Sequence, residues 1–322
     1  MDYQWYPGHM TRARRMMEEN IRLVDLVIEL LDARIPISSR NPDIDSLAQG
    51  KARLVILAKD DLADPYMTEQ FLAYYRNHAV TAIAVDARKK DTNREVQNAV
   101  SEATSEKRAR DLRRGIKNRP VRAMICGIPN VGKSTFINTL SGKSGAKTGN
   151  KPGVTRGRQW ISFSGMDLLD TPGILWPKFE DQQVGVRLAL TGAIRDEILD
   201  VEELAYQLIA FLQDRYPTLL QERYGTLDAP TACQLPPDGD NNALSSQNDS
   251  AIIRNSAYNE QECRVVLQKI AVHRNLLRAG GAADTARAAG MLLEDYRSGR
   301  IGRITLDDPD MGGVMQPAPD EQ

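Results

Sequence analysis

The chain has 322 residues, of which 41% are hydrophobic and 26% are charged, a composition typical of a globular protein with room for two domains. Its formal net charge of −1 provides no overall positive field, so any binding of nucleic acid must depend on local patches. The three cysteines, Cys126, Cys233 and Cys263, lie far apart, which argues against a disulfide-rich secreted protein and against a zinc site.

The N-terminal segment, residues 1–22, lacks the apolar core of a secretory signal. No apolar run elsewhere approaches the length of a membrane span. We therefore expect a cytoplasmic protein with no membrane partner. Residues 10–22 (MTRARRMMEENIR) have the pattern of a helix.

Three apolar runs come next, and each predicts a strand: residues 23–33, 52–58 and 80–87. Helical stretches over 66–77 and 91–110 lie between and after them. Further along, residues 121–126 predict a fourth strand, followed by a glycine-rich turn and a helix from Lys133 to Leu140, and residues 158–164 and 166–170 read as a hairpin. Nearly all-apolar strands that alternate with helices are typical of a parallel sheet covered on both faces. We expect one doubly wound α/β domain over residues 23–200.

The chain changes character after residue 200. Residues 201–216 have helical periodicity, and residues 228–256 are rich in Pro, Asp, Asn and Ser. Two amphipathic helices are expected over 259–278 and 284–297. We therefore predict connecting helices, a flexible insertion or linker, a small all-helical domain and a disordered tail, at residues 201–227, 228–256, 257–305 and 306–322.

The segment GIPNVGKST, residues 127–135, matches the phosphate-loop pattern GxxxxGK[ST] between a strand and a helix. Gly127 and Gly132 let the backbone close around an anion, Lys133 reaches the β- and γ-phosphates, and the hydroxyl of Ser134 can ligate Mg²⁺. The other interpretation is an ordinary glycine-rich turn. The predicted nucleotide-binding residues of this loop are Asn130, Val131, Gly132, Lys133, Ser134 and Thr135.

Two further segments have the spacing of nucleotide switches. In DTPG, residues 170–173, Asp170 would hold Mg²⁺ through a water and the amide of Gly173 would sense the γ-phosphate. In KPGVTRG, residues 151–157, Thr155 offers a Mg²⁺ ligand that binds only when a γ-phosphate is present.

The strand LVILAKDDL, residues 54–62, ends in Lys59-x-Asp61, as guanine-reading strands of GTP-binding proteins do, but Ala58 stands where they have Asn. This strand and its two neighbours resemble the last three strands of a Ras-like GTPase domain, whereas the phosphate-loop, Thr155 and DTPG strands resemble the first three. The order indicates a circular permutation, which preserves the site because ligands bind at the carboxyl ends of the strands whatever the connectivity. A plain buried strand that ends in a polar turn is the alternative for residues 54–62.

This order, together with WYPGHM at residues 5–10, LDAR at residues 31–34 and the late helices joined by Gly-Gly, resembles the circularly permuted ribosome-assembly GTPases of the ribosome biogenesis GTPase A (YlqF) type. The resemblance covers nearly the whole chain except residues 228–256 and the tail. It implies a circularly permuted Ras-like P-loop GTPase domain followed by a small all-helical domain. It also implies a GTP-hydrolysing assembly factor, stimulated by the ribosome and using GTP, Mg²⁺ and K⁺.

The resemblance assigns roles to individual residues. The stem of Lys59 would lie over the guanine base, and the carboxylate of Asp61 would accept from N1–H and the 2-amino group. Ile174 stands where Ras-like enzymes carry a water-orienting Gln, and the resemblance implies that His9 supplies that function. A surface or helix-capping role is the alternative for His9. The amide oxygen of Asn130 could ligate K⁺ beside the phosphates.

Cations gather in three parts of the chain, which the resemblance connects with ribosomal RNA of the large (50S) subunit and its precursor. A solvated charged face is the alternative, and nothing in the chain indicates base reading or a DNA partner. The first region, residues 107–122, carries Lys107, Arg108, Arg110, Arg113, Arg114, Lys117, Arg119 and Arg122 against the single acid Asp111. The late helices bring Arg264, Lys269, Arg274, Arg278, Arg287, Arg297, Arg300 and Arg303, and Arg12, Arg14 and Arg15 lie near the N-terminus.

The prediction is a GTPase that binds rRNA and the pre-50S particle and is released when GTP is hydrolysed. Ala58 leaves open a P-loop ATPase or kinase that acts on a small molecule. A third hypothesis is an RNA-binding scaffold that has lost catalysis, although Lys133, Ser134, Thr155 and Asp170 argue against it.

Overall fold

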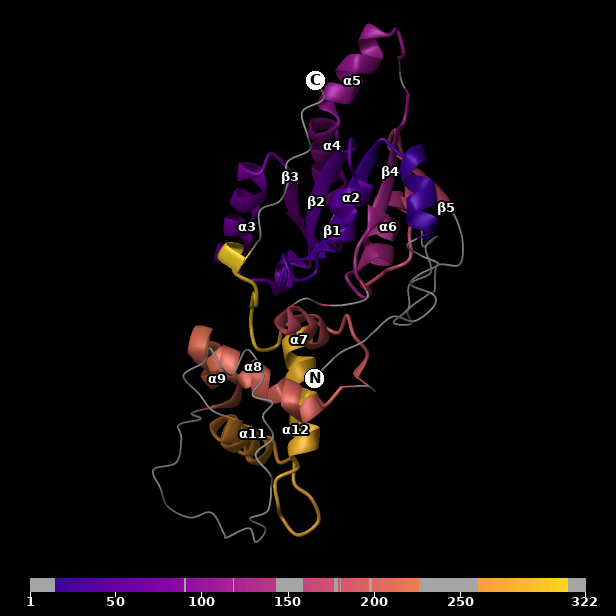
Figure 1. Ribbon diagram of the computed structural model, residues 1–322. Coiled ribbons are helices and arrows are strands. Elements are labelled where there is room, and N and C mark those ends of the chain that lie inside the picture. Colours follow the sequence, from indigo (N-terminus) through magenta and orange to yellow (C-terminus); the bar gives the residue numbers. More distant parts are fainter. Residues whose placement is uncertain are drawn as a thin grey trace. The chain divides into compact units, whose positions relative to one another are not determined.

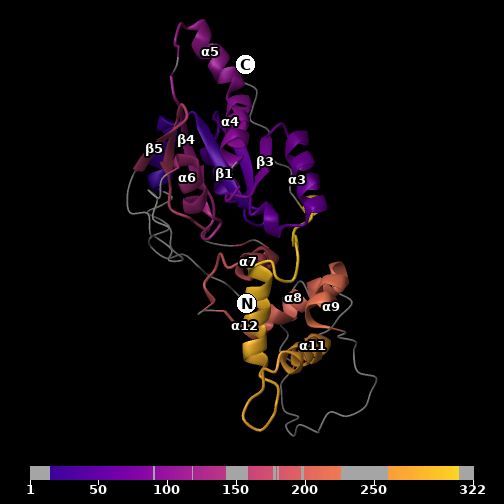
Figure 2. The same ribbon diagram turned by 180° about the vertical axis from the view of Figure 1, so that it is seen from behind.

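The computed structural model describes residues 15–89, 91–117, 119–142, 159–176, 179, 181–196, 199–225 and 260–311. The chain divides into two compact units. One comprises Tyr3–Glu180 together with Arg303–Gln322, and the other contains Asp181–Gly302. Figure 1 shows the elements of both units, and Figure 2 shows them from behind.

The first unit is built on a six-stranded sheet with the order β3-β2-β1-β4-β6-β5. All neighbouring strands in it are parallel except β5 and β6, which form the predicted hairpin. The strands are β1 (Leu26–Asp32), β2 (Ala52–Ala58), β3 (Thr81–Val85), β4 (Val121–Cys126), β5 (Gln159–Phe163) and β6 (Met166–Asp170). The six predicted strands are confirmed.

Helices connect and cover these strands (Figures 1 and 2). They are α2 (Asp43–Leu47), α3 (Pro65–Asn77), α4 (Thr92–Ala103), α5 (Ser105–Arg113) and α6 (Lys133–Ser141), with short 3₁₀ turns η1 (Ile21–Leu23), η2 (Asp60–Leu62) and η4 (Pro309–Met311). The helix α3 begins where Pro65 fixes the first turn and the carboxylate of Asp64 accepts from the amides of Tyr66 and Met67. Residues 91–110, predicted as one helical stretch, form α4 and α5 with a break at the buried Thr104.

The sheet is the core of this unit. All seven residues of β1 are buried, as expected for a central strand with neighbours on both faces. Val55 and Leu57 of β2 pack against Phe71 and Tyr75 of α3. A second cluster joins Val27 of β1 and Met124 of β4 to side chains from the first described residues and from α2.

The strand order confirms the circular permutation. If the phosphate-loop strand β4 is counted first, the chain order becomes β4, β5, β6, β1, β2, β3, which is the order expected of a Ras-like domain cut between its third and fourth strands. The carboxyl ends of β1, β2, β3, β4 and β6 consequently lie on one edge of the sheet, because these strands are mutually parallel.

The second unit is helical. It contains α7 (Gln182–Leu190), α8 (Val201–Arg215), α9 (Pro217–Tyr224), α11 (Glu260–His273) and α12 (Thr285–Arg297). The helix α8 is its centre and packs against the other four. The fully buried carboxylate of Asp295 accepts from Arg223, Tyr224 and Arg300, which compensates for burying its charge.

The observed units differ from the predicted domains at two places. The helices from α7 onward belong to the helical unit, so the boundary lies at Asp181 instead of residue 200. Disorder was predicted from residue 306, but Leu306 and Asp307 are buried against the sheet-containing unit. The predicted insertion at 228–256 lies outside the described residues. None of the described helices is long and apolar enough to cross a membrane.

Candidate nucleotide-binding site

The phosphate loop lies between the end of β4 and the start of α6, as predicted. A Cβ added to Gly127 would lie 2.4 Å from the backbone oxygen of Leu30, so this position accepts no side chain. Asn130 and Gly132 take positive φ values of 57° and 101°, which turn the backbone into the first turn of α6. The N-terminus of this helix presents amide donors and the positive end of its dipole to the loop.

Lys133 is buried at the base of this loop. Its amino group donates to the backbone oxygens of Gly127 (3.1 Å) and Ile128 (3.3 Å). Burial lowers the pKa of Lys133 to about 8, although the charge of Asp170 acts in the opposite direction. The group therefore remains mostly protonated at pH 7 and is held where a phosphate would bind.

The DTPG segment lies against the phosphate loop. The hydroxyl of Thr171 donates to the oxygen of Ile125 in β4 at 2.6 Å, which ties the two strand ends together. A Cβ on Gly173 would lie 2.9 Å from Nζ of Lys133 and 3.0 Å from the backbone of Pro129. Gly173 is thus required by close approach. The next residue, Ile174, is buried in the core cluster with Met17 and Cys126, so its side chain cannot orient a water.

The base loop, Lys59–Asp64, follows β2 and lies next to the phosphate loop. Lys59 takes the left-handed conformation, with φ of 60°. Its amino group donates to the backbone oxygen of Asn130 (2.8 Å) and to Asp32 Oδ2 (2.9 Å). Burial lowers the pKa of Lys59, and Asp32 partly offsets that effect. These contacts join the two loops across β1.

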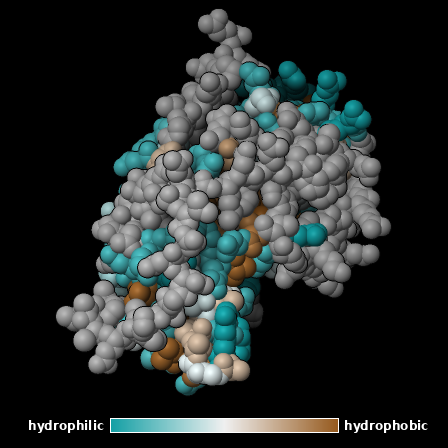
Figure 3. All heavy atoms as spheres, turned by 60° about the horizontal axis from the view of Figure 1, so that its bottom comes forward, coloured by the Kyte–Doolittle hydropathy of each residue, from teal (hydrophilic) through white to brown (hydrophobic). Residues whose placement is uncertain are grey.

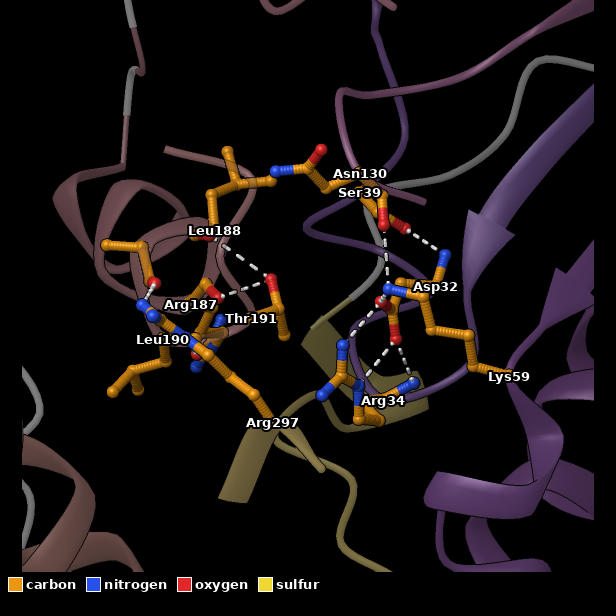
Figure 4. A network of polar contacts seen from close by, with 11 residues as sticks. Asp32, Arg34, Ser39, Lys59, Asn130, Arg187, Leu188, Leu190, Thr191 and Arg297 are labelled. Atoms are coloured by element: carbon orange, nitrogen blue, oxygen red, sulfur yellow. Dashed lines mark hydrogen bonds and ion pairs between the residues drawn. The ribbon is translucent and has the colours of Figure 1, made fainter. Parts of the chain in front are cut away.

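Asp32 and Arg34 form a buried network that the sequence did not predict (Figure 4). The guanidinium of Arg34 donates to both carboxylate oxygens of Asp32, at 2.9 and 2.8 Å. Ser39 accepts from the amide of Asp32. Burial alone would raise the pKa of Asp32, but the charges of Arg34 and Lys59 outweigh it and hold that pKa well below its ordinary value. The ionised carboxylate therefore fixes the amino group of Lys59.

The loop after β3 also contacts the base loop. Arg88 forms ion pairs with Asp61 and with Asp86. The hydroxyl of Thr139 in α6 donates to the oxygen of Ala87 at 2.6 Å. The sequence of residues 85–90 predicts no role for them, and only their basic character could have pointed to Arg88. Since Arg88 is largely exposed, its pair with Asp61 is worth at most about 1 kcal/mol.

Most of the predicted site residues lie at this one edge of the sheet. They are Lys59, Asp61, Asn130, Val131, Gly132, Lys133, Ser134, Thr135, Asp170 and Gly173. His9 and Thr155 lie outside the described residues. Ser134 is half-buried in the first turn of α6 and Asp170 is buried at the end of β6. Hydroxyl and carboxylate oxygens of this kind suit Mg²⁺, although no group of three or more His, Cys, Asp and Glu among the described residues is arranged to hold a metal.

Comparison with known proteins gives consistent results. Residues 122–230 match the family model described as 50S ribosome-binding GTPase. Ribosome biogenesis GTPase A of Bacillus cereus is 41% identical and covers 97% of this chain and 96% of that protein. The protein of the same name from Priestia megaterium is 42% identical and covers 96% of this chain and 98% of that protein.

Two solved structures have a similar fold. A GDP-bound structure of YlqF superposes with a TM-score of 0.59 at 23% identity, covering 92% of this chain and 100% of that one. GNP-bound YlqF from T. maritima also has a TM-score of 0.59, at 22% identity, covering 93% of this chain and 99% of that one.

Proposed function

The chain belongs to the ribosome biogenesis GTPase A family, and from this premise we propose that it binds the precursor of the large ribosomal subunit and is released when GTP is hydrolysed. The observation that carries the proposal is the meeting of Lys133, Gly173 and the base loop at one edge of a permuted GTPase sheet. As a family member the chain is a GTPase. Ribosome stimulation, rRNA binding, release and action in the cytoplasm are parts of the proposal.

We propose the following roles at the phosphates. The amides of residues 130–135 and the ammonium of Lys133 bind the β- and γ-phosphates. Ser134 and Asp170 hold Mg²⁺, which neutralises charge that develops on the phosphate oxygens. Thr155 joins them when a γ-phosphate is present, and the amide of Gly173 donates to that phosphate. Gly173 already lies against Lys133, which favours a shared phosphate ligand.

At the base, we propose that Asp61 accepts from guanine N1–H and the 2-amino group while the stem of Lys59 supports the ring. Adenine lacks this donor pair, so the carboxylate discriminates between the two bases. Arg88 forms an ion pair with Asp61 in the structure. Because Arg88 is exposed, this pair is weak enough for a guanine base to displace Arg88 from the carboxylate. Lys59 is already held in place by Asp32 and Asn130.

We expect Asp61→Ala to lower the preference for GDP over ADP by about 10- to 100-fold, because two hydrogen bonds to a charged acceptor are lost. Ala58→Asn should tighten GDP binding by about tenfold, since it restores a donor that the loop lacks. Calorimetric titration with both nucleotides measures each effect. Equal affinity of the unmodified protein for GDP and ADP would show that residues 59–61 do not read guanine.

We also propose that the side-chain oxygen of Asn130 ligates K⁺ beside the phosphates, where an added positive charge stabilises the transition state. GTP hydrolysis should then be about tenfold faster in K⁺ than in Na⁺ at equal ionic strength, which corresponds to a barrier about 1.4 kcal/mol lower. Asn130→Ala should remove the difference between the salts. Equal rates of the unmodified protein in both salts would speak against a cation at this position.

The proposed RNA contacts use exposed cations in both units. In and after α5, the exposed side chains include Arg108, Arg113, Arg114 and Lys117, and Arg122 lies 5.9 Å from the centre of the half-exposed Trp160 ring. Arg264, Arg278 and Arg287 are exposed in the helical unit. Figure 3 shows brown residues scattered among teal ones on the described part of its face.

One experiment separates this proposal from its alternatives. Hydrolysis of GTP and ATP is measured with and without purified 50S subunits, and co-sedimentation is followed in parallel. We expect GTP turnover that the subunits stimulate, and binding to them that weakens after hydrolysis. ATP turnover without any effect of the subunits would favour a small-molecule kinase or ATPase. Subunit binding without GTP turnover would favour a scaffold.

A further inference from the structure

Residues Arg303–Asp307, which we name the C-terminal strap, follow the helical unit in the chain but belong to the GTPase unit. Ile304, Thr305, Leu306 and Asp307 are buried, with exposed fractions of 0%, 2%, 4% and 3%. The strap forms no helix or strand. Its burial therefore depends on specific hydrogen bonds to the loops that it contacts.

The first half of the strap holds the base loop. The guanidinium of Arg303 donates to the backbone oxygens of Asp60 (2.6 Å) and Ala63 (2.7 Å). The amide of Ile304 donates to the oxygen of Leu62 at 3.0 Å. The hydroxyl oxygen of Thr305 accepts from the amide of Asp64 at 3.1 Å. These four hydrogen bonds surround Asp61 on both sides in the chain.

The second half holds the loop that supports Lys59. The amide of Leu306 donates to the oxygen of Arg34 at 2.7 Å. The carboxylate of Asp307 accepts from the amides of Ile37 and Ser38, both at 2.7 Å, and from the hydroxyl of Ser38 at 2.6 Å. Arg34 in turn fixes Asp32, which binds the amino group of Lys59. Both side chains proposed to recognise guanine are thus held through the strap.

The base loop needs such support for a physical reason. Its first residue, Lys59, takes a left-handed conformation that disfavours non-glycine residues. Position 58 holds Ala, so no side-chain amide there can tie the loop to its neighbours. The loop continues as a single 3₁₀ turn, η2, which is not rigid alone.

We propose that the C-terminal strap is a positioning element for guanine recognition, with Arg303 as its main positioning residue, and that it replaces the tie absent at Ala58. The inference rests on the proposed reading of guanine by Asp61. The strap does not touch the base. It sets the orientation of the Asp61 carboxylate through the backbone on either side, and a misoriented carboxylate loses the directional hydrogen bonds to the base.

The test compares GDP with inosine diphosphate, which lacks the 2-amino group and thus reports on Asp61. Arg303→Ala should lower the ratio of the two affinities by about tenfold, because the loop is no longer held from Asp60 and Ala63. Arg303→Lys, which keeps a donor, should recover part of the ratio. Thr305→Val is a second variant that loosens the same loop at Asp64. Arg76→Ala, an exposed arginine of α3 in the same unit, serves as the matched control and should change nothing.

A double-mutant cycle tests the replacement of the missing tie. Ala58→Asn should raise the ratio more in the Arg303→Ala background than in the unmodified protein, since each tie compensates for the loss of the other. If Arg303→Ala and Thr305→Val lower the melting temperature but leave the ratio unchanged, the strap is only structural and the inference is overturned. If Asp61→Ala itself leaves the ratio unchanged, the proposed guanine reading fails first. The two failures are therefore distinguishable.

Discussion

Lys133→Ala is expected to abolish tight binding of GDP and GTP and to reduce turnover by at least about 10³-fold. The ammonium is a buried donor of the phosphate loop, already oriented by the oxygens of Gly127 and Ile128. Each charge-assisted hydrogen bond to a phosphate contributes about 1.5–3 kcal/mol. Two of them correspond to about 10²–10⁴ in affinity, and turnover falls further because charge grows on the phosphate oxygens in the transition state.

The measurement is calorimetric titration with GDP, together with single-turnover hydrolysis at saturating protein. Lys133→Arg should restore little activity, because Gly173 and Pro129 leave no room for a guanidinium: even a Cβ on Gly173 would approach Nζ of Lys133 to 2.9 Å. Arg76→Ala controls for the loss of one positive charge from the unit, and melting curves control for folding. Hydrolysis of GTP by Lys133→Ala at the unmodified rate would show that the nucleotide site lies elsewhere.

The sheet and its phosphate loop could be predicted because their signals are local. Residues 52–58, 121–126 and 166–170 became strands with the predicted bounds. Each is a short apolar run, and short apolar runs that alternate with helices are typical of strands in a sheet covered on both faces. GIPNVGKST likewise carries its own geometry, in the close approach of Gly127 and the positive φ of Gly132.

The network around the base loop could not be predicted, because it depends on contacts between distant parts of the chain. Arg34 and Asp32 are close in sequence, but the contact that matters for the site is the one that Asp32 makes with the distant Lys59. Asp307 lies about 270 positions from Ile37 and Ser38, whose amides donate hydrogen bonds to its carboxylate. The segment after Thr305 is rich in Asp, Pro and Gly, which is the composition of a disordered tail. Asp307 is buried because these distant residues satisfy the hydrogen bonds of its carboxylate. The short helix α2 was missed for a similar reason, since its periodicity is too brief to detect.

The circular permutation explains why the site keeps its chemistry although its segments come in an unusual order. Binding residues follow the carboxyl ends of parallel strands, and those ends meet at one edge whichever strand comes first. The permutation instead changes the order in which the strands follow one another along the chain. It places residues 1–22 directly before β1, which pairs with the phosphate-loop strand β4.

This placement bears on the water that must attack the γ-phosphate. Ile174 follows DTPG at the position where Ras-like enzymes have a water-orienting Gln. Its side chain is buried with Met17 and Cys126, and Met17 belongs to the first described helical residues of the N-terminal segment. The start of that segment, including His9, is outside the described residues, but its end packs against Ile174. We propose that His9 supplies the group that orients this water.

His9→Ala should leave the affinity for GTP nearly unchanged, because the contact proposed for the imidazole is with the attacking water and not with the nucleotide. Turnover stimulated by 50S subunits should fall by about 10²–10⁴, the range for the loss of one positioned acid–base group. The intrinsic rate should fall less, because the proposal places His9 at the water in the complex with the subunit. If His9 instead caps the helix that follows it, the variant should melt at a lower temperature and keep its stimulated turnover. Single-turnover hydrolysis on 50S subunits, measured beside a melting curve of the same variant, decides between the two roles. A normal stimulated rate with an unchanged melting curve would exclude both.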